Sequence, residues 1–248
     1  MLRANSSPLA GDAGPVAALG AAGWLELNLL KAAEELAAAG RARVGFAQAV
    51  AETLRRAPIQ AWEADRWLRG MKLRLIRMEA FFFRAGTQKR AALSLFVRNE
   101  RGLNVGLRRE AITQMATYVS LITDYGYERA RTRFESRFMD VLVVDRNERA
   151  WIYAENKALG RTLEKLCDRL ASDFSESVPL IPDDEDARPV DDAVMKANHI
   201  WNHRPSHFWA VSPTLRKAYE VIFTEAGFRL VETGKIPTAD EQPSFEAF

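Results

Sequence analysis

The stretch MDVLVVDRNERAWIYAENK, residues 139–157, places charged residues at the ends of two apolar segments. Both segments are rich in β-branched and aromatic residues, and the polar DRNER between them is typical of a turn, which predicts a β-hairpin. Side chains alternate along a strand, so Tyr153, Glu155 and Lys157 share one face. Pairing through the turn allows Asp140 to lie beside Glu155, and the hairpin then gathers two carboxylates and one ammonium.

The segments around this hairpin predict an α/β sandwich built on a mixed sheet. The expected order is helix, three strands, helix, strand, helix, strand, and the proline-rich acidic stretch 175–192 is expected to be a loop. The expected helices are 107–126, 160–174 and 214–226, and the expected strands are 127–136, 137–145, 149–157, 206–212 and 228–232.

The region before residue 105 has a different pattern. Apolar residues at helical spacing predict helices over 24–39, 45–57 and 59–69, whereas residues 70–104 fit neither period cleanly and their class stays open. We therefore predict four segments. They are a disordered N-terminus at 1–20, a basic and mainly helical region at 21–104, an α/β domain at 105–235 and a polar tail at 236–248.

Composition excludes several classes of protein. The chain has 248 residues, 48% of them hydrophobic, which is enough for a core. Cys167 is the one cysteine, so an internal disulfide is excluded, and no apolar run is long enough to span a bilayer. G-x-S-x-G, Walker A and dinucleotide-binding patterns do not follow any expected strand. We expect a cytoplasmic protein without a membrane partner.

Charge is concentrated in one region. Between Arg55 and Arg109 there are 14 Lys or Arg and 4 acids, although the net charge of the whole chain is only +2. Basic residues among tryptophans and phenylalanines suit a surface that binds phosphates, but an ordinary solvated helix face explains the clustering equally well. The candidate nucleic-acid contacts are Arg66, Arg69, Lys72, Arg108 and Arg109.

The charged triplet itself points to a cation. Two carboxylates held close together repel each other, so a structure that builds such a pair normally contains a cation to satisfy it. Oxygen ligands suit Mg²⁺, which takes one or two protein carboxylates and keeps several waters. Lys157 beside the metal can orient water and neutralise charge on a phosphate. The alternative is that Asp140 and Glu155 end their strands and Lys157 is their surface salt-bridge partner.

One spacing in the hairpin resembles the signature of the PD-(D/E)XK nuclease superfamily. Asp140 is followed by fourteen residues and then by Glu155-Asn156-Lys157. The resemblance implies a restriction-endonuclease-like fold, with an αβββαβ core and a mixed central sheet at about residues 107–212. It implies that Asp140, Glu155 and the backbone carbonyl of Asn156 hold the metal and that Lys157 is the catalytic lysine.

The resemblance also implies a glutamate on the preceding helix, which would be Glu110. Met139 stands where the eponymous proline would be. A further accessory residue on the following helix would be Lys165, with Arg161 next.

The same resemblance implies a hydrolase, an endonuclease that cuts phosphodiester bonds with Mg²⁺, with Mn²⁺ as a substitute. The expected partner is nucleic acid, with DNA preferred over RNA, and domains of this kind resemble restriction, defence or mobile-element nucleases. The alternative is a catalytically inactive module on the same fold that binds nucleic acid or protein. The choice between DNA and RNA, strandedness, sequence specificity and oligomeric state stay open, including a homodimer or a complex with a partner protein.

Three histidines lie close together in the sequence, His199, His203 and His207, at four-residue spacing. That spacing on one helix could offer zinc ligands, but Pro205 breaks such a helix before the third histidine. A polar loop leading into the strand at 206–212 is the preferred reading. Cys167 lies among leucines and is expected to be a core residue.

Overall fold

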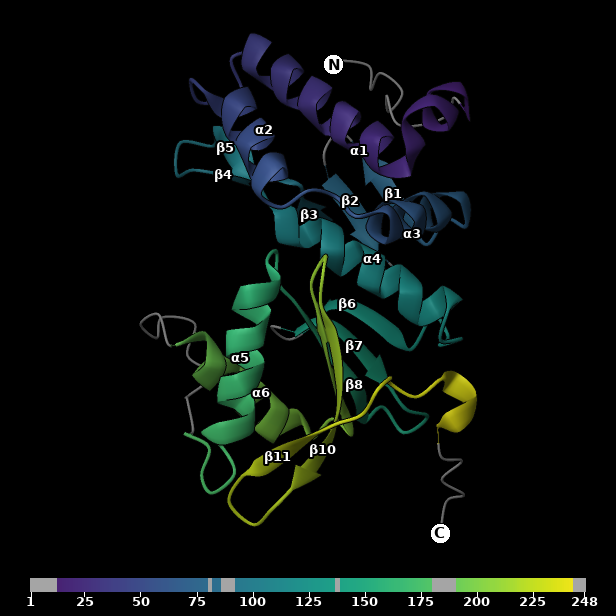
Figure 1. Cartoon of the computed structure of the whole chain (residues 1–248), viewed down its shortest axis with the longest axis vertical. Coiled ribbons are helices and arrows are strands. Elements are labelled where there is room, and N and C mark those ends of the chain that lie inside the picture. Colours follow the sequence, from purple (N-terminus) through teal and green to yellow (C-terminus); the bar gives the residue numbers. More distant parts are fainter. Residues whose placement is uncertain (1–12, 80–81, 86–91, 137–138, 180–190, 243–248) are drawn as a thin grey trace. The chain divides into compact units, whose positions relative to one another are not determined.

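The structure, a computed structural model, describes residues 13–79, 82–85, 92–136, 139–179 and 191–242 (Figure 1). It is a mixed α/β protein with two compact units, Met1–Val119 and Ser120–Phe248. The boundary lies inside helix α4 (Arg109–Thr123), later in the chain than the boundary expected at residue 105. Residues 1–12 of the predicted N-terminal segment and 243–248 of the predicted tail lie outside the described residues.

The N-terminal unit contains the three helices expected from the sequence, together with short strands. Helix α1 begins at Ala13 and has a kink at Gly20, where φ is 69°, so the prediction of disorder over 1–20 is wrong for its second part. The region left open by its sequence pattern forms strands, and the unit is less purely helical than predicted. Its elements are α1 (Ala13–Ala38), α2 (Phe46–Arg56), α3 (Ala61–Lys72), β1 (Ile76–Glu79), β2 (Phe82–Ala85), β3 (Ala92–Ser94), β4 (Phe96–Arg98) and β5 (Asn104–Leu107).

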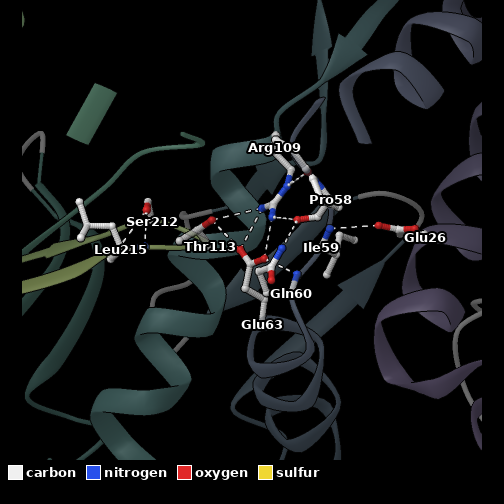
Figure 2. Close-up of polar contacts among 10 residues, drawn as sticks. Glu26, Pro58, Ile59, Gln60, Glu63, Arg109, Thr113, Ser212 and Leu215 are labelled. Atoms are coloured by element: carbon white, nitrogen blue, oxygen red, sulfur yellow. Dashed lines mark hydrogen bonds and ion pairs between the residues drawn. The ribbon is translucent and has the colours of Figure 1, made fainter. Parts of the chain in front are cut away.

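A buried ion pair joins the first turn of α3 to the first turn of α4, and the same arginine binds the loop between α2 and α3 (Figure 2). The guanidinium of Arg109 donates to both carboxylate oxygens of Glu63, at 2.6 and 2.9 Å, and to the backbone carbonyls of Ala57 and Pro58, at 2.7 and 2.9 Å. Thr113 adds a hydroxyl donor to Glu63 at 2.7 Å. Arg109 is buried, so the prediction that it contacts nucleic acid is wrong: its donors serve the fold.

The C-terminal unit is built on a six-stranded sheet in the order β11-β10-β9-β8-β7-β6. Strand β8 pairs parallel with β9, and the other neighbouring strands pair antiparallel, so the sheet is mixed as predicted. Two helices follow β8 before the chain returns as β9. The elements are β6 (Thr132–Ser136), β7 (Met139–Val144), β8 (Ala150–Asn156), α5 (Gly160–Ser172), α6 (Asp192–His203), β9 (His207–Val211), β10 (Arg216–Phe223) and β11 (Phe228–Glu232). A short 3₁₀ helix (Ala239–Glu241) follows the sheet.

Helices α5 and α6 pack together against one face of this sheet (Figure 1). Leucines spaced three and four residues apart on α5 produce one buried stripe. The cluster they form with α6 and the strands includes Leu142, Val144, Tyr153, Leu163, Leu166, Leu170, Ala197, Ile200, Phe208 and Val221. The face of the sheet that carries the hairpin carboxylates is therefore the face that the two helices cover.

Two predicted elements of this unit are wrong. Residues 214–226 were expected to be a helix, but β10 occupies 216–223 and pairs with β9 on one side and β11 on the other. Burial between two strands outweighs the helix propensity of this segment. The predicted polar loop around His199 and His203 is instead the end of α6, which stops at Arg204 in a left-handed conformation, before Pro205.

The contact between the end of α5 and the start of β11 gives a stability prediction. A Cβ added to Gly227 would lie 2.2 Å from the backbone oxygen of Phe174, which also accepts a hydrogen bond from the N–H of Phe228. Because backbone must shift to admit the methyl group, we expect Gly227→Ala to lower the free energy of unfolding by about 2 kcal/mol. Urea unfolding measures this. Gly234→Ala is the control, since a Cβ there meets nothing within 4 Å; equal stability of the two variants would contradict the prediction.

Candidate active site

The hairpin predicted from residues 139–157 is present as β7 and β8. Its register pairs Val141 with Ala154 and Leu142 with Tyr153, so the next step of the same register places Asp140 opposite Glu155. Paired residues lie on the same face of a sheet, and Tyr153 belongs to the core cluster under α5 and α6.

The turn of the hairpin is held by its own first residue. The Asp145 carboxylate accepts backbone N–H groups from Asn147 at 2.7 Å and Arg149 at 2.9 Å. Glu148 takes a left-handed conformation with φ of 62°. An aspartate that satisfies the backbone of the following residues is typical of such turns. The turn thereby keeps the register that aligns the two carboxylates.

Glu155 lies at the end of β8 and is fully buried. Its Oε1 is 2.8 Å from Nζ of Lys157, and its Oε2 is 2.8 Å from Nζ of Lys196, which comes from α6. The hydroxyl of Tyr153, two residues earlier on the same face, donates to Oε2 at 2.6 Å. A buried carboxylate needs such partners, because ionisation away from water is otherwise costly.

The surroundings shift the pKa values of two of these partners. Burial alone would lower the pKa of Lys196, but the nearby carboxylates of Glu155 and Asp140 outweigh it, and the pKa is raised. Burial and the same two carboxylates raise the pKa of Tyr153 well above its ordinary value. Lys196 is therefore a cation and Tyr153 a neutral hydrogen-bond donor at neutral pH.

Asp140 is partly exposed and interacts with the strand beside it. Its Oδ2 accepts the backbone N–H of Asn156 at 2.7 Å and the side-chain amide of the same residue at 3.2 Å. Lys157 is 3.0 Å from Oδ2 of Asp192, the first residue of α6. The structure thus brings Asp140, Glu155 and Lys157 together as predicted, and it adds two charged residues from α6.

The other predicted site residues have different positions. Glu110 is partly exposed in the first turn of α4, in the N-terminal unit, and its role stays a prediction. Lys165 and Arg161 are exposed on α5, and the helix residue that contacts Glu155 is Lys196 of α6. Of the basic residues predicted to contact nucleic acid, Arg69, Lys72 and Arg108 are exposed and Arg66 is partly exposed.

The donor chemistry at the hairpin fits a hard divalent cation. Two carboxylates from neighbouring strands are a set of oxygen ligands that Mg²⁺ uses, completed by water. Within the described residues, no group of three or more His, Cys, Asp or Glu side chains is arranged to hold a metal. The fit therefore rests on Asp140 and Glu155 alone among the side chains.

The remaining sequence candidates belong to the fold. The rings of His199 and His203 lie 6.4 Å apart on α6, and the ring of His207 packs against Trp151 from β9. Cys167 is buried, and burial raises the pKa of its thiol to about 11. A thiol with such a pKa is a poor nucleophile at neutral pH, in agreement with the predicted core role.

Comparisons of the chain with family models, with curated proteins and with solved structures each returned no match. In the described part of the chain, each helix is too short or too polar to cross a membrane. The residues of the site therefore carry the functional conclusion.

Proposed function

We propose that this protein is a Mg²⁺-dependent nuclease of the PD-(D/E)XK type, with a restriction-endonuclease-like core, which hydrolyses phosphodiester bonds of DNA. The observation that carries the proposal is the buried carboxylate of Glu155, which has Asp140 opposite it and the ammonium of Lys157 at 2.8 Å. Burying a carboxylate at a strand end is costly, and a chain with no chemical use for it could place an apolar residue there.

The order of elements supports the fold part of the proposal. Helix α4 leads into three antiparallel strands, β6 to β8, and the chain returns through α5 and α6 to β9, parallel to β8. This order resembles the αβββαβ core of the superfamily, with one helix added in the crossover and two strands added after it. The acidic residues lie on β7 and β8, which are neighbours in the sheet.

Each residue of the site has a part in this chemistry. Asp140, Glu155 and the backbone carbonyl of Asn156 would hold Mg²⁺, which supplies a Lewis acid for the charge that develops on the phosphate. Lys157 donates hydrogen bonds to the attacking water and to the phosphate oxygens. The oxygen of that water bonds to phosphorus and the water loses a proton to solvent, one phosphorus–oxygen ester bond breaks, and the leaving oxygen takes up a proton from solvent.

A second candidate function is a binding module without catalysis. The favouring observation is that both oxygens of Glu155 already have ammonium partners, Lys157 and Lys196. A site that has lost its metal and its activity is expected to pair its remaining carboxylates with ammonium groups in this way. Such a module would bind nucleic acid through the basic region of the N-terminal unit and would leave it uncut.

Cleavage of duplex DNA, single-stranded DNA and RNA, with Mg²⁺, with Mn²⁺ and with EDTA, separates the two functions. Asp140→Asn is the diagnostic variant, since asparagine still accepts the N–H of Asn156 but removes one anionic ligand. We expect metal-dependent cleavage by the wild type, and a rate at least about 100-fold lower for Asp140→Asn. Asp168→Asn, an exposed acid on α5, is the control. Binding without cleavage under every condition would favour the module instead.

The basic side of α3 gives a prediction about nucleic-acid binding. Replacing Arg66, Arg69 and Lys72 together by glutamine removes three positive charges from one helix. If each neutralises a phosphate, the slope of log K against log salt falls by roughly 0.9 for each residue. Fluorescence anisotropy with two duplexes of unrelated sequence measures this. Loss of binding to only one duplex would contradict a phosphate contact.

A further inference from the structure

Helix α6 contributes two opposite charges to the site. Asp192 and Lys196 are four residues apart, so they lie on the same side of the helix. Asp192 Oδ2 is 3.0 Å from the Lys157 ammonium, and Lys196 Nζ is 2.8 Å from Glu155 Oε2. The hairpin pair and the helix pair together form a chain of alternating charge, from Asp192 through Lys157 and Glu155 to Lys196.

The contacts in this row of alternating charges occupy most of the hydrogen-bond acceptor positions of the Glu155 carboxylate. An ionised carboxylate has about four lone-pair positions, two on each oxygen. Oε2 accepts from Lys196 at 2.8 Å and from the Tyr153 hydroxyl at 2.6 Å, so both of its positions are taken. Oε1 accepts from Lys157 at 2.8 Å. A divalent cation that uses Oε2 must therefore displace one of the two donors.

Lys196 is the donor best suited to leave. Tyr153 is fully buried and its ring is part of the core under α5 and α6. Lys196 has a flexible side chain of four methylenes, and 11% of that side chain is exposed, whereas Tyr153 has no exposed surface. Lys157 keeps a second carboxylate partner in Asp192 and remains anchored when a cation arrives.

We propose that Lys196 and a divalent cation compete for Glu155. Lys196 neutralises the carboxylate when no metal is bound, and metal binding releases its ammonium from Oε2. The inference rests on the proposed function, because it takes Glu155 as a metal ligand. It explains why α6 places a lysine against a carboxylate that already has Lys157 as a partner.

Mn²⁺ binding tests the competition without any nucleic acid. Isothermal titration calorimetry of wild type and Lys196→Gln should give a dissociation constant at least about tenfold lower for the variant, because a like charge next to the cation has been removed. Lys196→Arg keeps the charge and should bind about as weakly as wild type. Lys31→Gln loses the same charge from an exposed position on α1 and should also match wild type. Circular dichroism of each variant verifies folding.

The Mn²⁺ titrations distinguish failure of the competition between Lys196 and the metal from failure of the proposed metal-dependent function. Equal affinity of wild type and Lys196→Gln, together with loss of binding in Glu155→Gln, would overturn the competition and leave the metal site standing. Weaker binding by Lys196→Gln would mean that the lysine supports the site, which also overturns the competition. Failure of every protein to bind Mn²⁺ would remove both the competition and the metal-dependent function.

A second measurement needs only the wild-type protein. Acetylation of lysines by an activated ester, followed by mass spectrometry, reports how accessible each ammonium is. Addition of Mn²⁺ should raise the labelling rate of Lys196 several-fold and leave exposed Lys165 unchanged. An unchanged rate at Lys196, at Mn²⁺ concentrations that saturate binding, would overturn the competition.

Discussion

Glu155→Gln should reduce metal-dependent cleavage at least about 1000-fold, a larger loss than for any other single change at the site. Glutamine preserves the size of the side chain but removes the anionic ligand at the end of β8. It also leaves the ammoniums of Lys157 and Lys196 facing a neutral group, 2.8 Å away in the native protein. Breaking a buried ion pair in this way costs about 3 kcal/mol, so we expect a clear loss of stability as well.

The two effects need separate measurements, because an unfolded enzyme is also inactive. Initial rates on a duplex substrate should be taken at a temperature where circular dichroism shows both proteins folded. Glu164→Gln, an exposed change of the same kind on α5, should leave both rate and stability unchanged. Retention of a rate within a few-fold of wild type by folded Glu155→Gln would exclude Glu155 from the chemistry.

Arg109→Met should lower the free energy of unfolding of the N-terminal unit by roughly 3–5 kcal/mol. The change removes the only charged partner that Figure 2 draws for the Glu63 carboxylate and takes donors from the carbonyls of Ala57 and Pro58. A bidentate guanidinium in this position is not replaceable by lysine without loss of geometry. Urea unfolding followed by tryptophan fluorescence measures the change, since Trp67 on α3 is buried in the same unit.

A double-mutant cycle shows whether the pair acts as a unit. Combined with Glu63→Leu, Arg109→Met no longer leaves a buried carboxylate alone, so the double variant should lose less stability than the sum of the single variants. Arg108→Met, on the exposed neighbour, should change stability by no more than about 0.5 kcal/mol. A loss below about 1 kcal/mol for Arg109→Met would mean that the network contributes little.

The hairpin was predictable because its signals are local. Two apolar segments, 139–144 and 150–156, with an aspartate-led turn between them predict paired strands, and the alternation of side chains along a strand puts Tyr153 and Glu155 on one face. Strand β10 was not predictable in this way. Its residues are compatible with a helix, and only pairing with β9 and β11, which the sequence does not display, makes the segment a strand.

The same division applies to the charged residues. Asp140, Glu155 and Lys157 are close in sequence, and strand periodicity is enough to bring them together. Lys196 is distant in sequence, and its spacing from Asp192 signals only a charged helix face, which is usually solvated. Arg109 was predicted to contact nucleic acid because it belongs to a group of basic residues. Its burial against Glu63 depends on the tertiary structure and is not visible in the composition.

The parallel pairing of β8 with β9 also bears on the order in which the protein folds. The hairpin of β7 and β8 closes a short loop, whereas β9 reaches β8 only after the whole crossover with α5 and α6 has been arranged. Long loops are closed more slowly than short ones, and parallel pairs are therefore late events. Until α6 packs against the hairpin, Glu155 has Lys157, one residue beyond β8, but lacks Lys196, so the site passes through a stage with less positive charge than the native protein has.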